Sequence, residues 1–162
     1  MNKIFISILI VIVFIGILAW LGDSASSKDK VSAPSALIVE DGLKTYNFGT
    51  ISMGKGKVSH SFKIRNSGNE VMQMERMYTS CMCTSASLTK GDDRFGPYGM
   101  PGHGLVPSLN QSLDPNQEAT VEVIFDPAAH GPSGVGKIER SVIIENGSGR
   151  LMEHGITAFV TP

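Results

Sequence analysis

The chain has 162 residues, of which 14 are basic and 15 acidic, and its formal net charge is −1. Without a broad positive surface it cannot neutralise many phosphates, so nucleic acid is not expected as a partner. The 18 glycines and 8 prolines favour short strands and many turns over a helical bundle. Two cysteines, Cys81 and Cys83, are too few for the framework of a small disulfide-stabilised protein.

The N-terminal segment carries no charge from Ile4 to Leu21. As a helix that rises about 1.5 Å per residue it would be about 27 Å long, close to the roughly 30 Å hydrocarbon core of a bilayer. Residues 1–21 are therefore predicted to form a single-pass membrane anchor. A cleaved signal peptide is the alternative, with a cleavage site near residues 24–26, although the apolar run exceeds the usual length of about 7 to 15 residues.

Residues 22–36 are small, polar and aperiodic. Such a segment buries too little apolar surface to offset the entropy of ordering, which predicts a flexible linker. Residues 37–162 then form a single domain of ordinary size. The few lysines on the two sides of the anchor are nearly balanced, so charge alone gives almost no orientation.

The pattern of residues 37–162 is typical of short strands separated by turns. The clearest strand is 57–66, where Val58, His60, Phe62 and Ile64 alternate with polar residues. This pattern predicts an all-β fold, an immunoglobulin-like antiparallel β-sandwich of about seven strands. The strands are predicted at residues 37–40, 45–49, 57–66, 71–78 with a bulge, 119–125, 138–145 and 151–160.

A Gly- and Pro-rich insertion at residues 89–112 interrupts this pattern. It is too long for an ordinary hairpin loop, and long insertions without regular structure are usually functional or disordered.

Several pieces of the chain resemble, in the same order, a bacterial family of unknown function. They include the Phe-Gly-Thr of residues 48–50, the Ser-Cys-Met-Cys-Thr of residues 80–84 and the strand at 121–127 that ends in Asp-Pro. That family carries a central S-C-x-C-T motif and is similar to the immunoglobulin-like domains of Hydin and major sperm protein. The resemblance covers roughly residues 45–160, and Met82 departs from the glycine usual between the cysteines.

The resemblance implies an exported β-sandwich and brings no established reaction with it. On that ground residues 37–162 are expected outside the cytoplasm, held at the cell membrane by the N-terminal helix. No enzymatic activity is expected either, since the chain lacks a phosphate-binding Gly-Lys-Ser/Thr loop, a Gly-x-Ser-x-Gly elbow and a His-Glu-x-x-His motif.

Cys81 and Cys83 are the main candidates for chemistry, and three interpretations of them stay open. In the first, one cysteine is a small buried hydrophobe and the other has no role. In the second they form a disulfide, which would close a very small ring and be easily reduced. In the third they bind a metal ion, for which the backbone must turn between them so that both sulfurs reach one atom.

The metal interpretation depends on further soft donors close by in the sequence. Met100 and His103 flank a Pro-Gly turn within the insertion, and thiolate and thioether donors favour Cu(I), with imidazole tolerated. The predicted site is therefore Cys81, Cys83, Met100 and His103, with Met82 as a weaker candidate. A closed zinc site is poorly supported because a second pair of cysteines is absent from the sequence.

The other histidines have more ordinary interpretations. His60 and His154 lie on apolar strand faces and are expected to be partly buried with their hydrogen bonds satisfied. His130 lies in a loop that either approaches the cysteines or faces solvent.

Three functions follow from these observations. The first is a non-enzymatic binding or scaffolding module that presents a sheet edge or loops to another envelope protein. The second is an extracytoplasmic Cu(I)-binding protein, and the third a thiol–disulfide exchanger, which the absence of a β-α pattern disfavours.

Overall fold

The computed structural model describes residues 36–104 and 107–162. The predicted anchor at 1–21 and nearly all of the predicted linker at 22–36 lie outside these residues. Within the described ranges the chain has no α-helix, and so none that is long and apolar enough to cross a membrane.

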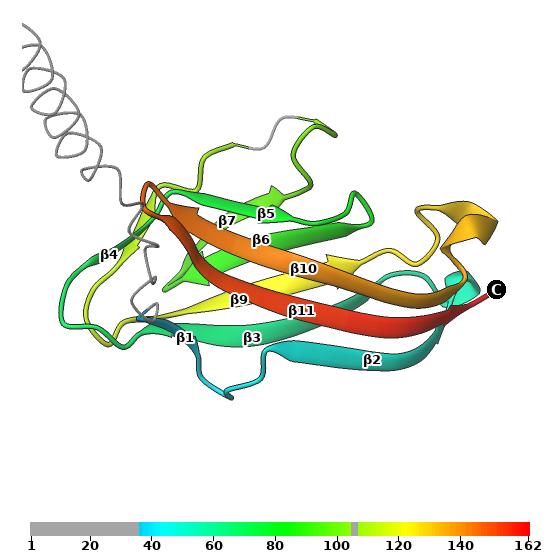
Figure 1. Cartoon of the computed structure of the whole chain (residues 1–162), viewed down its shortest axis with the longest axis horizontal. Coiled ribbons are helices and arrows are strands. Elements are labelled where there is room, and N and C mark those ends of the chain that lie inside the picture. Colours follow the sequence, from blue (N-terminus) through cyan, green and yellow to red (C-terminus); the bar gives the residue numbers. More distant parts are fainter. Residues whose placement is uncertain (1–35, 105–106) are drawn as a thin grey trace, which may run out of the picture. The chain divides into compact units, whose positions relative to one another are not determined.

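The described residues contain eleven strands and two short 3-10 helices. Most of the strands form two sheets, in which nearly all pairings are antiparallel (Figure 1). One sheet has the strand order β1-β3-β9-β6-β7, and the other has the order β2-β11-β10-β5. The remaining strands, β4 and β8, pair with each other. The elements are β1 (Leu37–Val39), β2 (Thr45–Ser52), η2 (Met53–Lys55), β3 (Val58–Asn66), β4 (Met72–Met74), β5 (Arg76–Thr79), β6 (Thr84–Lys90), β7 (Asp93–Tyr98), β8 (Gln111–Leu113), β9 (Glu118–Phe125), η3 (Gly131–Gly134), β10 (Gly136–Asn146) and β11 (Gly149–Thr161).

The first two strands belong to different sheets, and one of their pairings is parallel. β1 pairs antiparallel with β3, whereas β2 pairs parallel with β11, from Thr45 beside Gly155 to Ser52 beside Thr161. Between them the chain passes from one sheet to the other through a turn after β1, in which the N–H of Gly42 donates to the carbonyl of Val39. The prediction of an all-β sandwich is confirmed, and every strand pairing in the described residues except that of β2 with β11 is antiparallel.

The strand predicted over 71–78 is in fact two strands in two sheets. β4 and β5 are separated by Glu75, whose N–H donates to the carbonyl of Glu145 and whose carbonyl accepts from the N–H of Leu109. These bonds take the place of ladder bonds at the point where the chain changes partners. The methionines of this segment break strict alternation because the buried positions change from even numbers in β4, where Met74 is buried, to odd numbers in β5, where Met77 is buried.

Three further strands, β6, β7 and β8, were not predicted, and together with the division of 71–78 into two strands they raise the count from about seven to eleven. β6 lies between β9 and β7 and buries Ala86 and Leu88, but its serines and threonines hide the alternation. β7 occupies residues 93–98 of the predicted insertion and forms a hairpin with β6. Pro97 is tolerated there because β7 is an edge strand whose pairing with β6 is irregular between Phe95 and Tyr98.

The core lies between the two larger sheets and is built from alternate residues of their long strands. Along β9 every second side chain from Ala119 to Phe125 is buried, and β11 repeats this from Met152 to Val160. The predicted inward positions Phe62 and Ile64 of β3 are also buried. Since each such side chain contributes about 1.5 to 3 kcal/mol on burial, these strands hold the sandwich together.

One core residue, His154 on β11, departs from expectation. It is fully buried, where partial burial was predicted, and among the described residues neither ring nitrogen has a hydrogen-bond partner. Its ring stacks on Phe62 at 3.9 Å between centroids, and His60 lies 6.3 Å away with its own ring stacked on Tyr46. The prediction of a satisfied histidine is therefore wrong for His154, because aromatic rings surround it instead of polar groups.

Candidate metal centre

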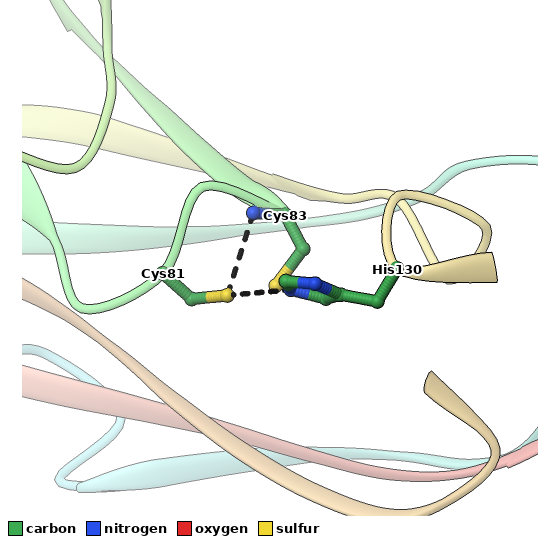
Figure 2. A group of neighbouring side chains, drawn as sticks. All are labelled: Cys81, Cys83 and His130. Carbon is green, nitrogen blue, oxygen red and sulfur yellow. Dashed lines mark hydrogen bonds between the residues drawn. The ribbon is translucent and has the colours of Figure 1, made fainter. Parts of the chain in front are cut away.

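Cys81 and Cys83 lie in a tight turn that joins β5 to β6. The N–H of Thr84 donates to the carbonyl of Cys81 at 3.1 Å, which closes the turn around Met82 and Cys83. The hydroxyl of Thr79 lies 3.1 Å from the carbonyl oxygen of Cys81 and 2.9 Å from that of Thr84, so it fixes both ends of the turn. The turn directs both sulfurs to the same side (Figure 2).

Met82 at the tip of this turn points into solvent and is 52% exposed. Its φ is not positive, so the turn accepts a side chain there without backbone strain. Methionine in the position between the cysteines is therefore compatible with the turn.

The loop after β9 brings a third donor to the two sulfurs. β6 and β9 are paired so that Thr84 lies opposite Phe125, and the next residue, Asp126, donates its N–H to the carbonyl of Cys83 at 2.8 Å. Two successive turns then follow, with N–H bonds from Ala129 to Asp126 and from Gly131 to Ala128. They carry the His130 ring back over the cysteine turn.

The three side chains form one cluster (Figure 2). The Sγ of Cys81 lies 3.2 Å from Nε2 of His130 and accepts a bond of 3.4 Å from the N–H of Cys83. Cys81 Sγ, Cys83 Sγ and a ring nitrogen of His130 all lie within 4.8 Å of one another. Both cysteines are free thiols, 9% and 3% exposed, whereas His130 is exposed. The cluster is thus buried on the cysteine side and reached from solvent on the histidine side.

Arg140 of β10 supplies positive charge next to the thiols. Its Nε donates to Cys83 Sγ at 3.4 Å. β10 is held against the cysteine turn because Ser80 donates its N–H to the carbonyl of Ser141 at 3.0 Å and its hydroxyl accepts from the N–H of Ser141 at 2.8 Å. Arg140 therefore faces the sulfurs from the opposite sheet to β6.

The two thiols differ in acidity. Burial alone would raise the pKa of Cys81, but hydrogen bonds from the Cys83 thiol, from His130 and from the Cys83 N–H, with the charge of Arg140, lower that pKa to about 7. Burial and the neighbouring Cys81 raise the pKa of Cys83. The sulfurs, by their charge and by accepting hydrogen bonds, raise the pKa of Arg140 against the opposing effect of burial. Cys81 is therefore the thiol of the pair that ionises first, and it begins to do so near neutral pH.

This donor set fits a soft metal ion. Thiolate sulfur selects Cu(I), zinc and similar ions, and imidazole suits them too. Because such an ion lies about 2.0 to 2.3 Å from sulfur and nitrogen, three ligands spaced evenly around it lie about 3.5 to 4.0 Å apart. The three donors, all within 4.8 Å of one another, need only a small further approach to reach these distances. Among the described residues no fourth histidine, cysteine or carboxylate joins the group. A three-coordinate ion such as Cu(I) suits it better than a closed tetrahedral zinc site.

The residues predicted from the sequence are only partly brought together. Cys81 and Cys83 meet, but His103 is exposed and does not belong to the cluster. Half-buried Met100 opens a turn closed by the N–H of His103, and the loop starts close to the cysteines, because Thr79 donates its N–H to the carbonyl of Gly99. The roles of Met100 and His103 as ligands stay predictions, and His130 is the histidine found at the sulfurs.

With this geometry established, the chain can be compared with known protein families. Residues 40–95 match the family model DUF1573, described as a protein of unknown function. The DUF1573 match contains β2, β3 and the complete cysteine turn, and ends within β7. It does not reach His130 or Arg140. No curated protein matches the chain.

One solved structure shares the fold of this chain. A protein of unknown function from Porphyromonas gingivalis W83 is 12% identical, with a TM-score of 0.53, and the match covers 81% of this chain and 51% of that one. The chain therefore spans about half the length of this relative, and the likeness shows a common fold alone.

Two weaker likenesses have TM-scores of 0.48. The secreted serine protease VesC from Vibrio cholerae is 12% identical over 88% of this chain and 25% of its own. A family 123 glycoside hydrolase from Clostridium perfringens is 10% identical over 73% and 23%. At TM-scores below 0.5 neither likeness establishes a shared fold.

Proposed function

We propose that this β-sandwich is a non-enzymatic binding module that holds one soft metal ion, Cu(I), at Cys81, Cys83 and His130. The observation that carries the proposal is the convergence of two buried thiols and one imidazole within 4.8 Å of one another. The three donors come from two loops far apart in the sequence, and each loop is held by its own backbone hydrogen bonds. Such preorganisation favours binding because little ordering entropy is lost when the ion enters.

Charge and access also favour this function. Two thiolates and one neutral imidazole match a soft cation, and the lowered pKa of Cys81 means that one thiol gives up its proton easily at neutral pH. His130 is exposed while both cysteines are buried, so we expect an ion to enter and leave on the side of His130. A binding module of this kind needs no group that performs acid–base or nucleophilic chemistry on a substrate.

Substitution of the two candidate histidines tests which one completes the site. His130→Ala is expected to weaken Cu(I) binding by the full chain about tenfold, since one ligand of three is lost while both thiolates stay. His103→Ala is the matched control and is expected to bind as the wild type does. Competition with bicinchoninate measures both affinities. A larger loss of Cu(I) affinity in His103→Ala than in His130→Ala would show that the third ligand is His103 of the insertion and not His130.

We further propose that the domain is immunoglobulin-like and is displayed outside the cytoplasm on the predicted anchor at residues 1–21. The crossover of the first two strands between the sheets supports the fold type. The uncharged stretch Ile4–Leu21 supports the anchor, and the resemblance to an exported family supports the orientation. A reporter enzyme that is active only outside the cytoplasm is expected to be active when it is fused after Pro162. Activity only of a reporter that requires the cytoplasm would show that the orientation is the opposite.

A further inference from the structure

The positive charge of Arg140 is directed at the sulfurs, and no carboxylate in the described part of the chain balances it. Its Nε lies 3.4 Å from Cys83 Sγ, and its Nη1 donates to the carbonyl of the preceding residue, Glu139. None of the ion pairs found among residues 36–104 and 107–162 includes Arg140. The guanidinium therefore acts electrostatically on whatever occupies the thiol site.

A count of charges shows what this arrangement favours. Two thiolates carry −2 and Arg140 carries +1, so a monovalent ion makes the group neutral, whereas a divalent ion leaves it at +1. The neutral combination is favoured because Cys83 is buried and Arg140 half-buried, so an excess charge at the thiols is less well solvated than it would be in water.

From this we infer that Arg140 determines the selectivity of the site, favouring monovalent soft ions such as Cu(I) and Ag(I) over divalent Zn(II) and Cd(II). The inference rests on the proposed function, since it concerns the same metal site. Arg140 acts through repulsion and does not coordinate the ion.

The ratio of two affinities isolates this effect. Arg140 also stabilises the thiolates, which helps any cation to bind, but that contribution is the same for both ions and cancels in the ratio. What is left is the repulsion between Arg140 and the additional unit charge of a divalent ion. At an effective dielectric constant of about 20 and a separation of about 5 Å this amounts to about two orders of magnitude in affinity. Solvent screening of the half-buried side chain reduces the expected effect to about tenfold.

Competition titrations of the purified full chain with Ag(I) and Cd(II) test the inference, because neither ion oxidises thiols. In Arg140→Gln the ratio of the Cd(II) to the Ag(I) dissociation constant is expected to fall about tenfold. Arg140→Lys keeps the charge and is expected to keep most of the ratio. Lys137→Gln removes an exposed positive charge from the same strand without touching the sulfurs and is expected to leave the ratio unchanged.

The outcomes are separable. If the wild type binds both ions and the ratio is the same in Arg140→Gln, the inference is wrong while the proposed function stands. An equal fall in Arg140→Lys would show that the guanidinium shape matters and not its charge, which also contradicts the inference. If the wild type binds neither ion, the proposed function itself fails. Arg140→Met serves as a second neutral variant should Arg140→Gln not fold.

Discussion

Simultaneous replacement of Cys81 and Cys83 by serine is expected to lower the Cu(I) affinity of the full chain at least about a thousandfold. A serine hydroxyl is a hard donor that keeps its proton at neutral pH, so the variant offers Cu(I) a single imidazole and no thiolate. The loss should exceed that of His130→Ala, because the sulfurs supply both the soft donors and the negative charge.

The same variant should keep its fold. The turn is closed by the Thr84 N–H and held by the Thr79 hydroxyl, and a serine hydroxyl at position 81 can accept the Cys83 N–H in place of the sulfur. Far-ultraviolet circular dichroism of wild type and variant is therefore expected to superimpose. Met82→Ala is the matched control, since it alters the exposed tip of the same turn and should leave Cu(I) affinity within about threefold of the wild type. Undiminished Cu(I) binding in the double-serine variant would refute the proposed metal site.

Replacement of His154 by leucine is expected to stabilise the domain by about 1 to 3 kcal/mol at pH 7. The reason is that leucine of similar size removes two buried nitrogens for which the described residues offer no hydrogen-bond partner. The lost stacking on Phe62 works against this gain but is worth only about 0.5 to 1.5 kcal/mol. Urea unfolding of wild type and variant measures the difference.

The variant should also be less sensitive to acid. Burial and the neighbouring His60 lower the pKa of His154, whereas Asp41 and the backbone of Leu43 oppose the shift without reversing it. The unfolded chain therefore takes up a proton near pH 6.5 and the folded protein only at lower pH. Between these two values the unfolded state binds more protons, so the free energy of unfolding falls as the pH decreases from about 6.5 to the folded pKa.

Comparison of unfolding at pH 7 and pH 5.5 isolates this contribution. His60 has a pKa lowered by burial, so some acid sensitivity should persist in His154→Leu. His103→Ala, which removes an exposed histidine, should retain the full acid sensitivity of the wild type. If His154→Leu and wild type lose equal stability between pH 7 and pH 5.5, the buried histidine is not the source of the acid sensitivity.

Strands with strict alternation were predictable from the sequence, and those without it were not. β3 and β9 bury every second residue over most of their length, so their side-chain pattern identifies them directly. β6 buries three consecutive residues, Ala86 to Leu88, and therefore lacks the pattern of a half-exposed strand. β4 and β5 belong to different sheets, which no local pattern reveals because the partner strands are distant in the sequence.

The cysteines were predictable as a site, but their partners were not. Cys81 and Cys83 are the only thiols and lie one residue apart, a local signal. His130 reaches them only because β6 and β9 are neighbours in register, and Arg140 only because β10 lies against the start of the turn. Met100 and His103 seemed better candidates from the sequence because they lie closer along the chain, but proximity along the chain is not proximity in a sandwich.

The parallel pairing of β2 with β11 has a mechanical consequence. The chain enters β2 at Thr45, beside Gly155, and leaves the domain after Thr161, beside Ser52. A force that pulls the two ends of the domain apart would slide these strands past each other, so that their hydrogen bonds bear the load together and not one after another. The three-residue strand β1 precedes this pair and would detach first. Under tension the sandwich would thus release the short segment of β1 first, while the rest of its core stays closed.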